Sequence, residues 1–456
     1  MTALHSVPSG ATRFAAIDFG TSNSAVALPV PGSAQRVQLV LLEGAHPTMP
    51  TAVFYRADTP ANQIDAERLY GRAAIAAYVE GLDGRLMRSM KSILGSSLLD
   101  QSTDIGGGRA VRYRDVVVGY LRHLKRLAEA EQAKALGHAA PPLTRVVLGR
   151  PVFFVDDDPE RDAQAQAALL AAAHAVGFSE VLFQYEPIAA ALDFESTINE
   201  EKLVLVADIG GGTSDFSLVR VGPERSRNRR GQADRRDDIL ANHGVHLAGT
   251  DFDRHVELAA ILPLLGYRSR RPPRKGEPAG SGAEVPSSVY FDLASWHLIN
   301  TVYAPQRIAE WRRMADWFGD KRHHARLMTT LNERLGHGLA AAAEQAKIDV
   351  ATSGAAQIDL SAVEWGLAST LDPAQAAQAI EADLERIVQA AATTLRLAGV
   401  APNDVDVLYF TGGSTGLTAL VDRISAGFPR AAQVRGDRFA SVATGLGLHA
   451  RAVFGG

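Results

Sequence analysis

The segment Lys202–Val221, KLVLVADIGGGTSDFSLVRV, places a glycine-rich turn between two runs of apolar residues. We predict strands at Lys202–Asp208 and Asp215–Val221, because short apolar runs on either side of turn residues are typical of a β-hairpin. The turn exposes successive backbone N–H groups that can bind an anion, and its glycines let a phosphate approach the backbone closely. Asp208 at the strand end provides a hard oxygen of the kind that Mg²⁺ prefers. The segment therefore predicts a phosphate-binding hairpin.

A similar segment, Phe14–Pro29, occurs near the N-terminus and reads FAAIDFGTSNSAVALP. Here Asp18 ends the first apolar run, and Gly20–Asn23 forms the turn before the second. Each hairpin alone could be an ordinary turn with an aspartate cap. The two copies are too far apart for a short-repeat protein. Together they predict a duplicated protein with one phosphate-binding hairpin in each of two lobes.

A third glycine turn lies in Asp406–Ala419, DVLYFTGGSTGLTA, where we predict a strand, a turn and a helix. Such a turn can pass close to a nucleoside, and the helix N-terminus can face an anion. Gly412–Gly416 also fits the G-x-S-x-G nucleophile elbow of hydrolases. That alternative needs an acid, a histidine and further strands after Ser414, and too little chain follows to provide them.

Composition excludes several classes of protein. The chain has 456 residues, and 46% hydrophobic residues with 21% charged residues are ordinary for a globular protein. The net charge of -4 gives no basic field for nucleic acid. There are no cysteines, which excludes disulfides, thiolate metal sites and a cysteine nucleophile. No apolar stretch is long enough for a spanning helix, so we expect a soluble, cytoplasmic protein that does not interact with membranes or nucleic acids.

The rest of the chain predicts alternating strands and helices after Pro142, which is typical of an α/β fold. We expect helices between about residues 66 and 93. Three segments are predicted to be flexible loops, namely Asp104–Gly108, Arg225–Asp238 and Arg268–Ser288. Three tryptophans are predicted to supply the core of a helical subdomain, namely Trp296, Trp311 and Trp317.

Four further motifs occur between the three glycine turns. They are Lys91–Gly95 (KSILG), Tyr185–Ala191 (YEPIAAA), Ala248–Asp253 (AGTDFD) and Glu344–Lys347 (EQAK). In this order the motifs resemble those of the actin, sugar-kinase and heat-shock ATPase superfamily, and most closely the ATPase domain of DnaK-type heat-shock chaperones. The resemblance covers about residues 14–450, and the layout is most similar to the stand-alone YegD-type group.

The resemblance implies an α/β, actin-like (ribonuclease H-like) two-lobed ATPase with duplicated sheet-and-helix domains. It implies a flexible N-terminus at residues 1–12, lobe I at 13–200 and lobe II at 201–456, with the final helix able to return to lobe I. Each lobe would carry an inserted subdomain, at about 45–115 and 251–365. The chaperones of this family continue into a peptide-binding β-sandwich, which we do not expect in this chain.

The resemblance also implies ATP or ADP with Mg²⁺ between the lobes. Lys91 would neutralise charge and position the attacking water, Glu186 and Asp215 would bias the water network, and Asp18 and Asp208 would order the metal. Asp208 and Thr213, beside the γ-phosphate, complete the expected catalytic set. The expected nucleotide-contacting residues are Gly20, Thr21, Ser22, Asn23, Gly210, Gly211, Gly212, Thr213, Glu344, Lys347, Gly412, Gly413 and Ser414.

Three residues depart from the family pattern in the nucleoside region. Ile348 and Gly416 occupy positions where the family has arginines, and Ala351 replaces a serine. We therefore expect no adenine held between two guanidinium groups, which leaves base selectivity open.

The implied function is slow ATP hydrolysis with a chaperone-like or partner-regulating role, and the implied partner is a protein such as a co-chaperone-like exchange factor. Two alternatives remain open. A small-molecule kinase would share the phosphate motifs, and a nucleotide-binding scaffold would lack hydrolysis.

Overall fold

The computed structural model describes the whole chain except residues 1–13, 31–32, 34–35, 59–67, 107, 156–157, 196, 229–234, 274, 277, 279–280, 297, 438–439 and 456. The N-terminus expected to be flexible lies outside the described residues. The chain forms two compact units. The first contains Met1–Val245, Gln389–Thr415 and Ile424–Gly456, and the second contains His246–Val388 and Gly416–Arg423. Both predicted hairpins belong to the first unit, whereas the lobe boundaries inferred from the sequence stay a prediction.

The first sheet is built around the N-terminal hairpin. Strands β1 and β2 are antiparallel, β10 is parallel to β1, and β11 is parallel to β10. The strand order is β11-β10-β1-β2-β3, and β4 also pairs with β2. The strands are β1 (Phe14–Phe19), β2 (Asn23–Pro29), β3 (Val37–Leu39), β4 (Thr48–Pro50), β10 (Arg145–Arg150) and β11 (Glu180–Tyr185).

The second sheet repeats this pattern around the second hairpin. Strands β12 and β13 are antiparallel, β14 extends the sheet beside β13, and β17 and β18 continue it in parallel on the other side. The order is β14-β13-β12-β17-β18. The strands are β12 (Lys202–Ile209), β13 (Ser214–Val221), β14 (Ile239–Val245), β17 (Val407–Thr411) and β18 (Ala432–Arg435). The two motifs that looked alike in the sequence are thus the central hairpins of two sheets with the same strand order.

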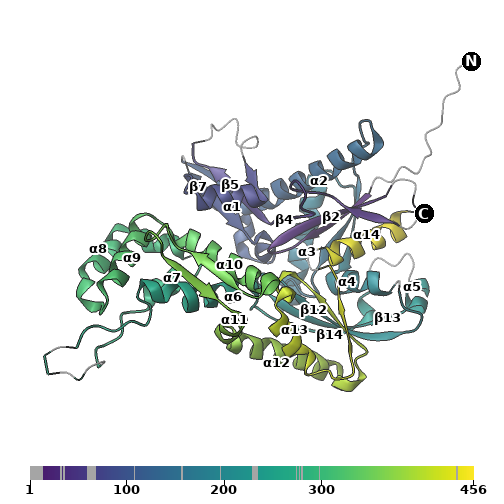
Figure 1. Cartoon of the computed structure of the whole chain (residues 1–456). Helices are drawn as coiled ribbons and strands as arrows, with labels where there is room; N and C mark the ends of the chain where they lie inside the picture. Colours follow the sequence, from purple (N-terminus) through teal and green to yellow (C-terminus); the bar gives the residue numbers. More distant parts are fainter. Residues whose placement is uncertain are drawn as a thin grey trace, which may run out of the picture. The chain divides into compact units, whose positions relative to one another are not determined.

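Two helices lie between the sheets and share one hydrophobic core with both of them. They are α4 (Glu186–Glu195) and α14 (Ser441–Phe454), seen side by side in Figure 1. A Cβ atom on Gly445 of α14 would lie 1.8 Å from the carbonyl oxygen of Ala189, so only glycine permits this close crossing. Alternate residues of β1 face the opposite core, where α2 (Tyr113–Leu136) and α3 (Pro159–Ala175) cover the first sheet.

Smaller elements between β4 and α2 differ from the prediction. A three-stranded sheet contains β5 (Ala52–Arg56), β6 (Leu69–Tyr70) and β7 (Gly84–Arg88), with α1 (Gly71–Val79) packed on it. The expected helices over residues 66–93 are therefore partly wrong, because β7 pairs with β5, a long-range contact that local periodicity does not reveal. The expected loop is also wrong for Asp104–Gly106, since β8 (Ser102–Gly106) and β9 (Arg109–Arg112) form a hairpin.

The described arginines of the segment before β14 form ion pairs that were not predicted. After α5 (Pro223–Asn228), Arg235 is buried and its guanidinium lies 2.6 Å from both Glu195 and Asp238, which are buried too. Arg225 also lies 2.7 Å from Asp238. The expectation of a solvated loop is wrong for these described residues, because two buried carboxylates need the arginines as counter-charges.

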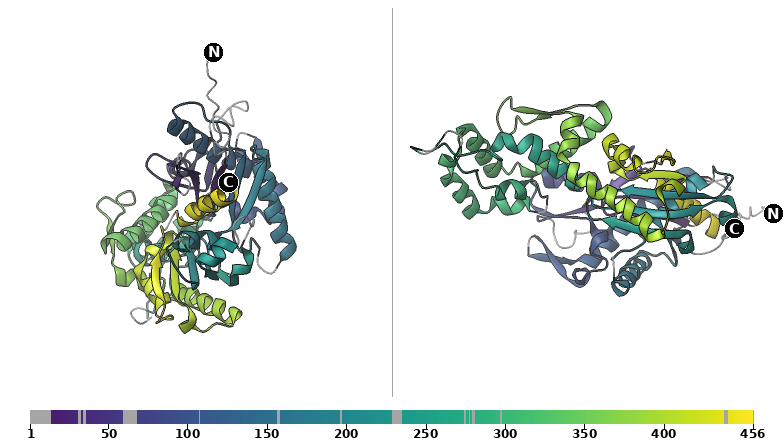
Figure 2. Two further views of the ribbon diagram at one scale, coloured as in Figure 1. Left: turned by 90° about the vertical axis from the view of Figure 1, so that its right-hand side faces the viewer. Right: turned by 90° about the horizontal axis from the view of Figure 1, so that it is seen from below.

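The second unit is mainly helical (green in Figure 2) and has a core of its own. In this unit Trp311 is buried, whereas Trp317 is 38% exposed, which corrects the expectation that both supply core. Its elements are α6 (Gly249–Val256), α7 (Ser288–Leu293), α8 (Pro305–Arg313), α9 (Lys321–Asn332), α10 (Gly336–Ser353), β15 (Ala356–Asp359), β16 (Ala368–Leu371) and α11 (Pro373–Ala379). Helices α12 (Glu381–Ala398) and α13 (Thr418–Ser425) have residues in both units. Within the described part of the chain, no helix has the length and hydropathy needed to cross a membrane.

Candidate functional site

The two glycine turns of the first unit touch each other. A Cβ atom added to Gly211, in the second turn, would lie 2.2 Å from the Oγ atom of Ser22 in the first turn. The predicted phosphate-binding hairpins therefore share one region, although each belongs to a different sheet.

The first turn is tight and is supported from outside the hairpin. A Cβ atom on Gly20 would lie 2.2 Å from the carbonyl oxygen of Asn23, so the turn requires a residue without a side chain. Thr51, between β4 and β5, donates its hydroxyl to Gly20 O at 2.8 Å and its backbone N–H to Ser22 O at 2.9 Å. Thr51 could not be singled out from the sequence, where its only signal is its place in a polar segment before a strand.

The second turn is closed by its own backbone and by the third glycine motif. Gly210 N donates to Thr213 O at 3.0 Å, and the Ser414 hydroxyl donates to Gly210 O at 2.7 Å. Gly412 has a φ of +88°, and a Cβ atom there would lie 2.8 Å from Oδ1 of Asp208. Glycine at this position therefore lets the third motif pack directly against the end of β12.

Acidic side chains gather where the strands β1, β12 and β13 meet the turns. Asp208 lies directly opposite Asp215 in the β12–β13 register. Burial raises the pKa of Asp208 to about 8, and the nearby Asp215, Glu186 and Asp18 contribute to the rise. Burial also raises the pKa of Asp18 to about 7, with a further contribution from Glu186 and an opposing one from Lys91. The two aspartates from the two hairpins therefore lie within electrostatic reach of each other.

One ammonium group faces this acidic cluster. The Nζ atom of Lys91 lies 2.5 Å from Oε1 of Glu186, and both side chains are largely buried. Burial lowers the pKa of Lys91, but Glu186, Asp18 and Asp208 outweigh this effect and raise it above its ordinary value. Lys91 is therefore charged, forms an ion pair with Glu186 and lies within electrostatic reach of Asp18 and Asp208.

Local backbone strain helps to place Lys91. It lies in a 3₁₀ turn, Met90–Ile93, whose N-cap Ser89 has a φ of +54°, a left-handed conformation that side chains disfavour.

Glu186 starts α4 directly after β11, and Gly149 of β10 leaves the space beside it, since a Cβ there would lie 3.3 Å from Oε1 of Glu186.

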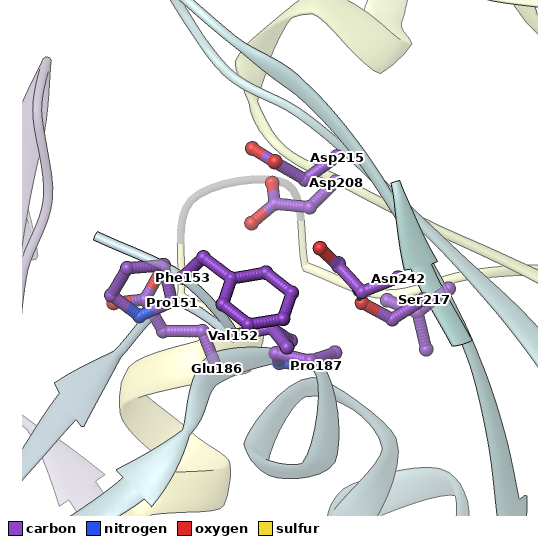
Figure 3. A pocket seen from close by; sticks show the side chains of 10 residues that line it. Pro151, Val152, Phe153, Glu186, Pro187, Asp208, Asp215, Ser217 and Asn242 are labelled. Atoms are coloured by element: carbon purple, nitrogen blue, oxygen red, sulfur yellow. Dashed lines mark hydrogen bonds between the residues drawn. The ribbon is translucent and has the colours of Figure 1, made fainter. Parts of the chain in front are cut away.

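A small pocket opens beside these carboxylates (Figure 3). Asp208, Asp215 and Glu186 provide its acidic side, and Ser217 and Asn242 provide further polar groups. The remaining lining residues are Pro151, Val152, Phe153, Pro187 and Val206. Ser217 and Asn242 could not be predicted as site residues from the sequence, because strand residues of these types carry no motif.

The residues predicted from the sequence fall in two places. The first unit contains Asp18, Gly20, Thr21, Ser22, Asn23, Lys91, Glu186, Asp208, Gly210, Gly211, Gly212, Thr213, Asp215, Gly412, Gly413 and Ser414. Glu344 and Lys347 lie on α10 of the second unit, where Lys347 Nζ is 2.5 Å from Asp253 Oδ1 and donates to Gly249 O. Glu344 is exposed. A role of these two residues in nucleotide binding stays a prediction.

The donor chemistry suits a hydrated magnesium ion. Asp18 and Asp208 offer carboxylate oxygens, and the cluster contains more acids than Lys91 can neutralise. Among the described residues, no three or more His, Cys, Asp or Glu side chains are grouped to hold a metal ion. Mg²⁺ usually keeps several waters and binds through one or two carboxylates plus substrate phosphates, which such a pair of aspartates can provide.

Comparisons with known proteins find one family and several relatives. Residues 108–258 match the family model described as Hsp70 protein. A chaperone protein HscA homolog of Aromatoleum aromaticum is 32% identical over 275 residues, which is 56% of this chain and 39% of that protein. A chaperone protein DnaK of Thermosipho melanesiensis is 28% identical over 242 residues, covering 53% of this chain and 34% of that protein. A chaperone protein HscA homolog of Aeromonas hydrophila is 31% identical over 255 residues, covering 53% and 36%. The matched segments thus span less than half the length of these relatives.

Proposed function

Because this chain is a DnaK-type Hsp70 ATPase-domain protein, we propose that it binds Mg-ATP and hydrolyses it slowly to ADP and phosphate. The observation that carries the proposal is the contact between the turns at Ser22 and Gly211, which puts two anion-binding loops beside one acidic cluster. The role served by this activity would be chaperone-like or partner-regulating.

The backbone of both turns would hold the β- and γ-phosphates. Gly20–Ser22 and Gly210–Thr213 offer N–H groups with little side-chain bulk, and turns of this kind form anion-binding concavities. Ser414 holds Gly210 O, so that its turn keeps its shape before a ligand arrives.

Asp18 and Asp208 would hold the hydrated Mg²⁺, which would supply positive charge next to the phosphates. Both carboxyl groups have raised pKa values, so a divalent cation would favour their ionised forms. The proposal thus accounts for an acidic cluster whose charge Lys91 neutralises only in part.

Lys91 and Glu186 would orient the attacking water. Their ion pair fixes the ammonium beside the aspartates, and Asp215 faces the same space from β13. Phosphoryl transfer depends mostly on positioning and charge stabilisation, so this set needs no strong base.

Gly412–Ser414 of the first unit, and Glu344 and Lys347 of the second, are each proposed to contact the nucleoside. Ile348 on α10 is 43% exposed and presents an apolar side chain, which supports weak discrimination between bases. We further propose a cytoplasmic location and a protein partner of the exchange-factor type.

Release of phosphate from ATP, measured with and without candidate acceptors, tests the proposal. Release without an acceptor, lost in Lys91→Ala and Asp208→Ala, is the expected result. Lys134→Ala is the matched control, because this lysine is exposed and lies far along α2. Turnover that depends on an acceptor would identify a small-molecule kinase, and nucleotide binding without turnover would identify a scaffold.

A further inference from the structure

Strand register arranges the polar side chains of the second sheet in two rows. In one row, Asp208 of β12 lies opposite Asp215 of β13, and Asp215 lies opposite Gly244 of β14. In the next row, two residues away on the same face, Ser217 lies opposite Asn242. Asn242 is therefore on the face of the acid pair, and it lines the same pocket.

Gly244 leaves the space that the acid pair occupies. A Cβ atom on Gly244 would lie 2.4 Å from Oδ1 of Asp215. The polar side chain that β14 contributes to the pocket therefore comes from Asn242. The first hairpin has no corresponding arrangement, because Asp18 lies opposite Ala25.

The orientation of the Asn242 amide follows from its hydrogen bonds. Its Nδ2 atom donates to Ser217 Oγ at 2.7 Å and to the carbonyl oxygen of Phe216 at 3.3 Å. A carbonyl oxygen only accepts, so the NH₂ group must face Phe216 and the Oδ1 atom must face the other way. Figure 3 shows the amide pointing into the pocket on the side of Asp208 and Asp215. Within the described part of the chain, Oδ1 has no hydrogen-bond partner.

The pocket is polar and has room for a water molecule. A buried water needs two to four polar partners. Asn242 Oδ1 would accept one of its hydrogens, while a carboxylate of Asp208 or Asp215 would accept the other.

We infer that Asn242 is a positioning residue, which holds a pocket water against the Asp208–Asp215 pair and thereby orients these two carboxyl groups. The inference rests on the proposed ATPase function for its kinetic consequences. It assigns a role in that site to a residue on the edge strand β14, outside every glycine motif.

The kinetic test compares Asn242→Leu, which has similar size and no hydrogen-bonding group, with Asn242→Gln, which keeps a carbonyl oxygen. We expect Asn242→Leu to lower kcat about threefold to tenfold, the effect of losing one neutral hydrogen bond. Affinity for Mg-ATP should stay unchanged, and Asn242→Gln should recover part of the activity. An unchanged kcat, or equal losses in both variants, would contradict the inference.

A second test needs no ATP and uses Mn²⁺ alone as the probe. Asn242→Asp would add a third carboxylate beside the acid pair, so Mn²⁺ should raise its Tm more than that of the unmodified protein. His243→Asp is the matched control, since it adds the same charge on the next residue and therefore on the other face of β14. Equal Mn²⁺ effects in the two variants would overturn the inference, whether or not the protein hydrolyses ATP. Absence of hydrolysis in the unmodified protein would instead count against the proposed function, and the Mn²⁺ comparison would still judge the position of Asn242.

Discussion

Lys91 Nζ lies 2.5 Å from Glu186 Oε1, although the two residues are 95 positions apart in the chain. This ion pair joins a 3₁₀ turn to the start of α4 and places one positive charge against a cluster of carboxylates. Lys91 and Glu186 do not depend on each other equally for charge compensation, because Lys91 interacts with Asp18 and Asp208 as well as with Glu186.

We predict that Lys91→Ala destabilises the nucleotide-free protein more than Glu186→Gln does. Removing Lys91 leaves the largely buried Glu186 without its counter-charge, which costs about 3 kcal/mol in comparable buried pairs. Removing Glu186 leaves Lys91 beside two other acids. Urea unfolding measures both values, with the exposed Lys134→Ala as control. A larger loss for Glu186→Gln would show that the other acids do not compensate Lys91.

We predict that Mg²⁺ binding in the presence of ADP strengthens as the pH rises. The pKa values of Asp18 and Asp208 are raised to about 7 and about 8, so near pH 6 both groups hold protons that the metal must displace. Calorimetric titration with Mg²⁺ at about pH 6, 7 and 9 measures the effect. The dependence should be smaller in Asp18→Asn and Asp208→Asn. If the Mg²⁺ affinity depended on pH in the same way in all three proteins, other groups would hold the metal.

We predict that Gly211→Ala destabilises the protein by about 1–3 kcal/mol, the usual cost of overpacking. The new methyl group would lie 2.2 Å from Ser22 Oγ and 3.0 Å from Ser22 Cβ, so the Ser22 side chain or one of the two turns must move. Gly212→Ala is the matched control, since a Cβ there meets nothing within 4 Å. Thermal unfolding should also show recovery in the double variant Ser22→Gly/Gly211→Ala. Equal stability of Gly211→Ala and Gly212→Ala would mean that the two turns are not in contact.

We predict that Glu257, in the second unit, makes stability fall as the pH rises. It is 1% exposed, its Oε1 atom has no hydrogen-bond partner among the described residues, and burial and Asp253 raise its pKa well above the ordinary value. A carboxyl group whose pKa is raised on folding contributes stability below its unfolded pKa, and this contribution is lost as the pH rises through the folded value. As the pH rises from about 5 to 8, the Tm of Glu257→Gln should therefore fall less than the Tm of the unmodified protein. The exposed Glu333→Gln should behave like the unmodified protein, and parallel curves for all three would contradict the prediction.

Both hairpins and the α/β class could be predicted because the evidence is local, whereas the actin-like fold was implied by the resemblance of the ordered motifs. A strand, an aspartate, a glycine turn and a second strand occupy contiguous residues, so one segment of sequence contains the whole pattern. The alternation of strands and helices after Pro142 is likewise visible within short windows. The YegD-type subgroup stays a prediction.

Residues whose environment comes from distant segments could not be predicted. Thr51 supports the first turn from another strand pair, and Asn242 reaches the acid pair only through the β13–β14 register. Arg235 looked like part of a solvated loop because its partner Glu195 belongs to a helix 40 positions away. Strand β7 exists because β5 pairs with it.

The amino-acid order alone therefore specified which residues carry charge and which turns can bind phosphate, since these properties follow from side-chain chemistry and from glycine backbones. Folding added the proximity of those groups. Asp18 and Asp208 acquire raised pKa values because two separate sheets bury them beside Glu186, an effect that Lys91 opposes, and electrostatic coupling depends on distances that a linear sequence does not contain.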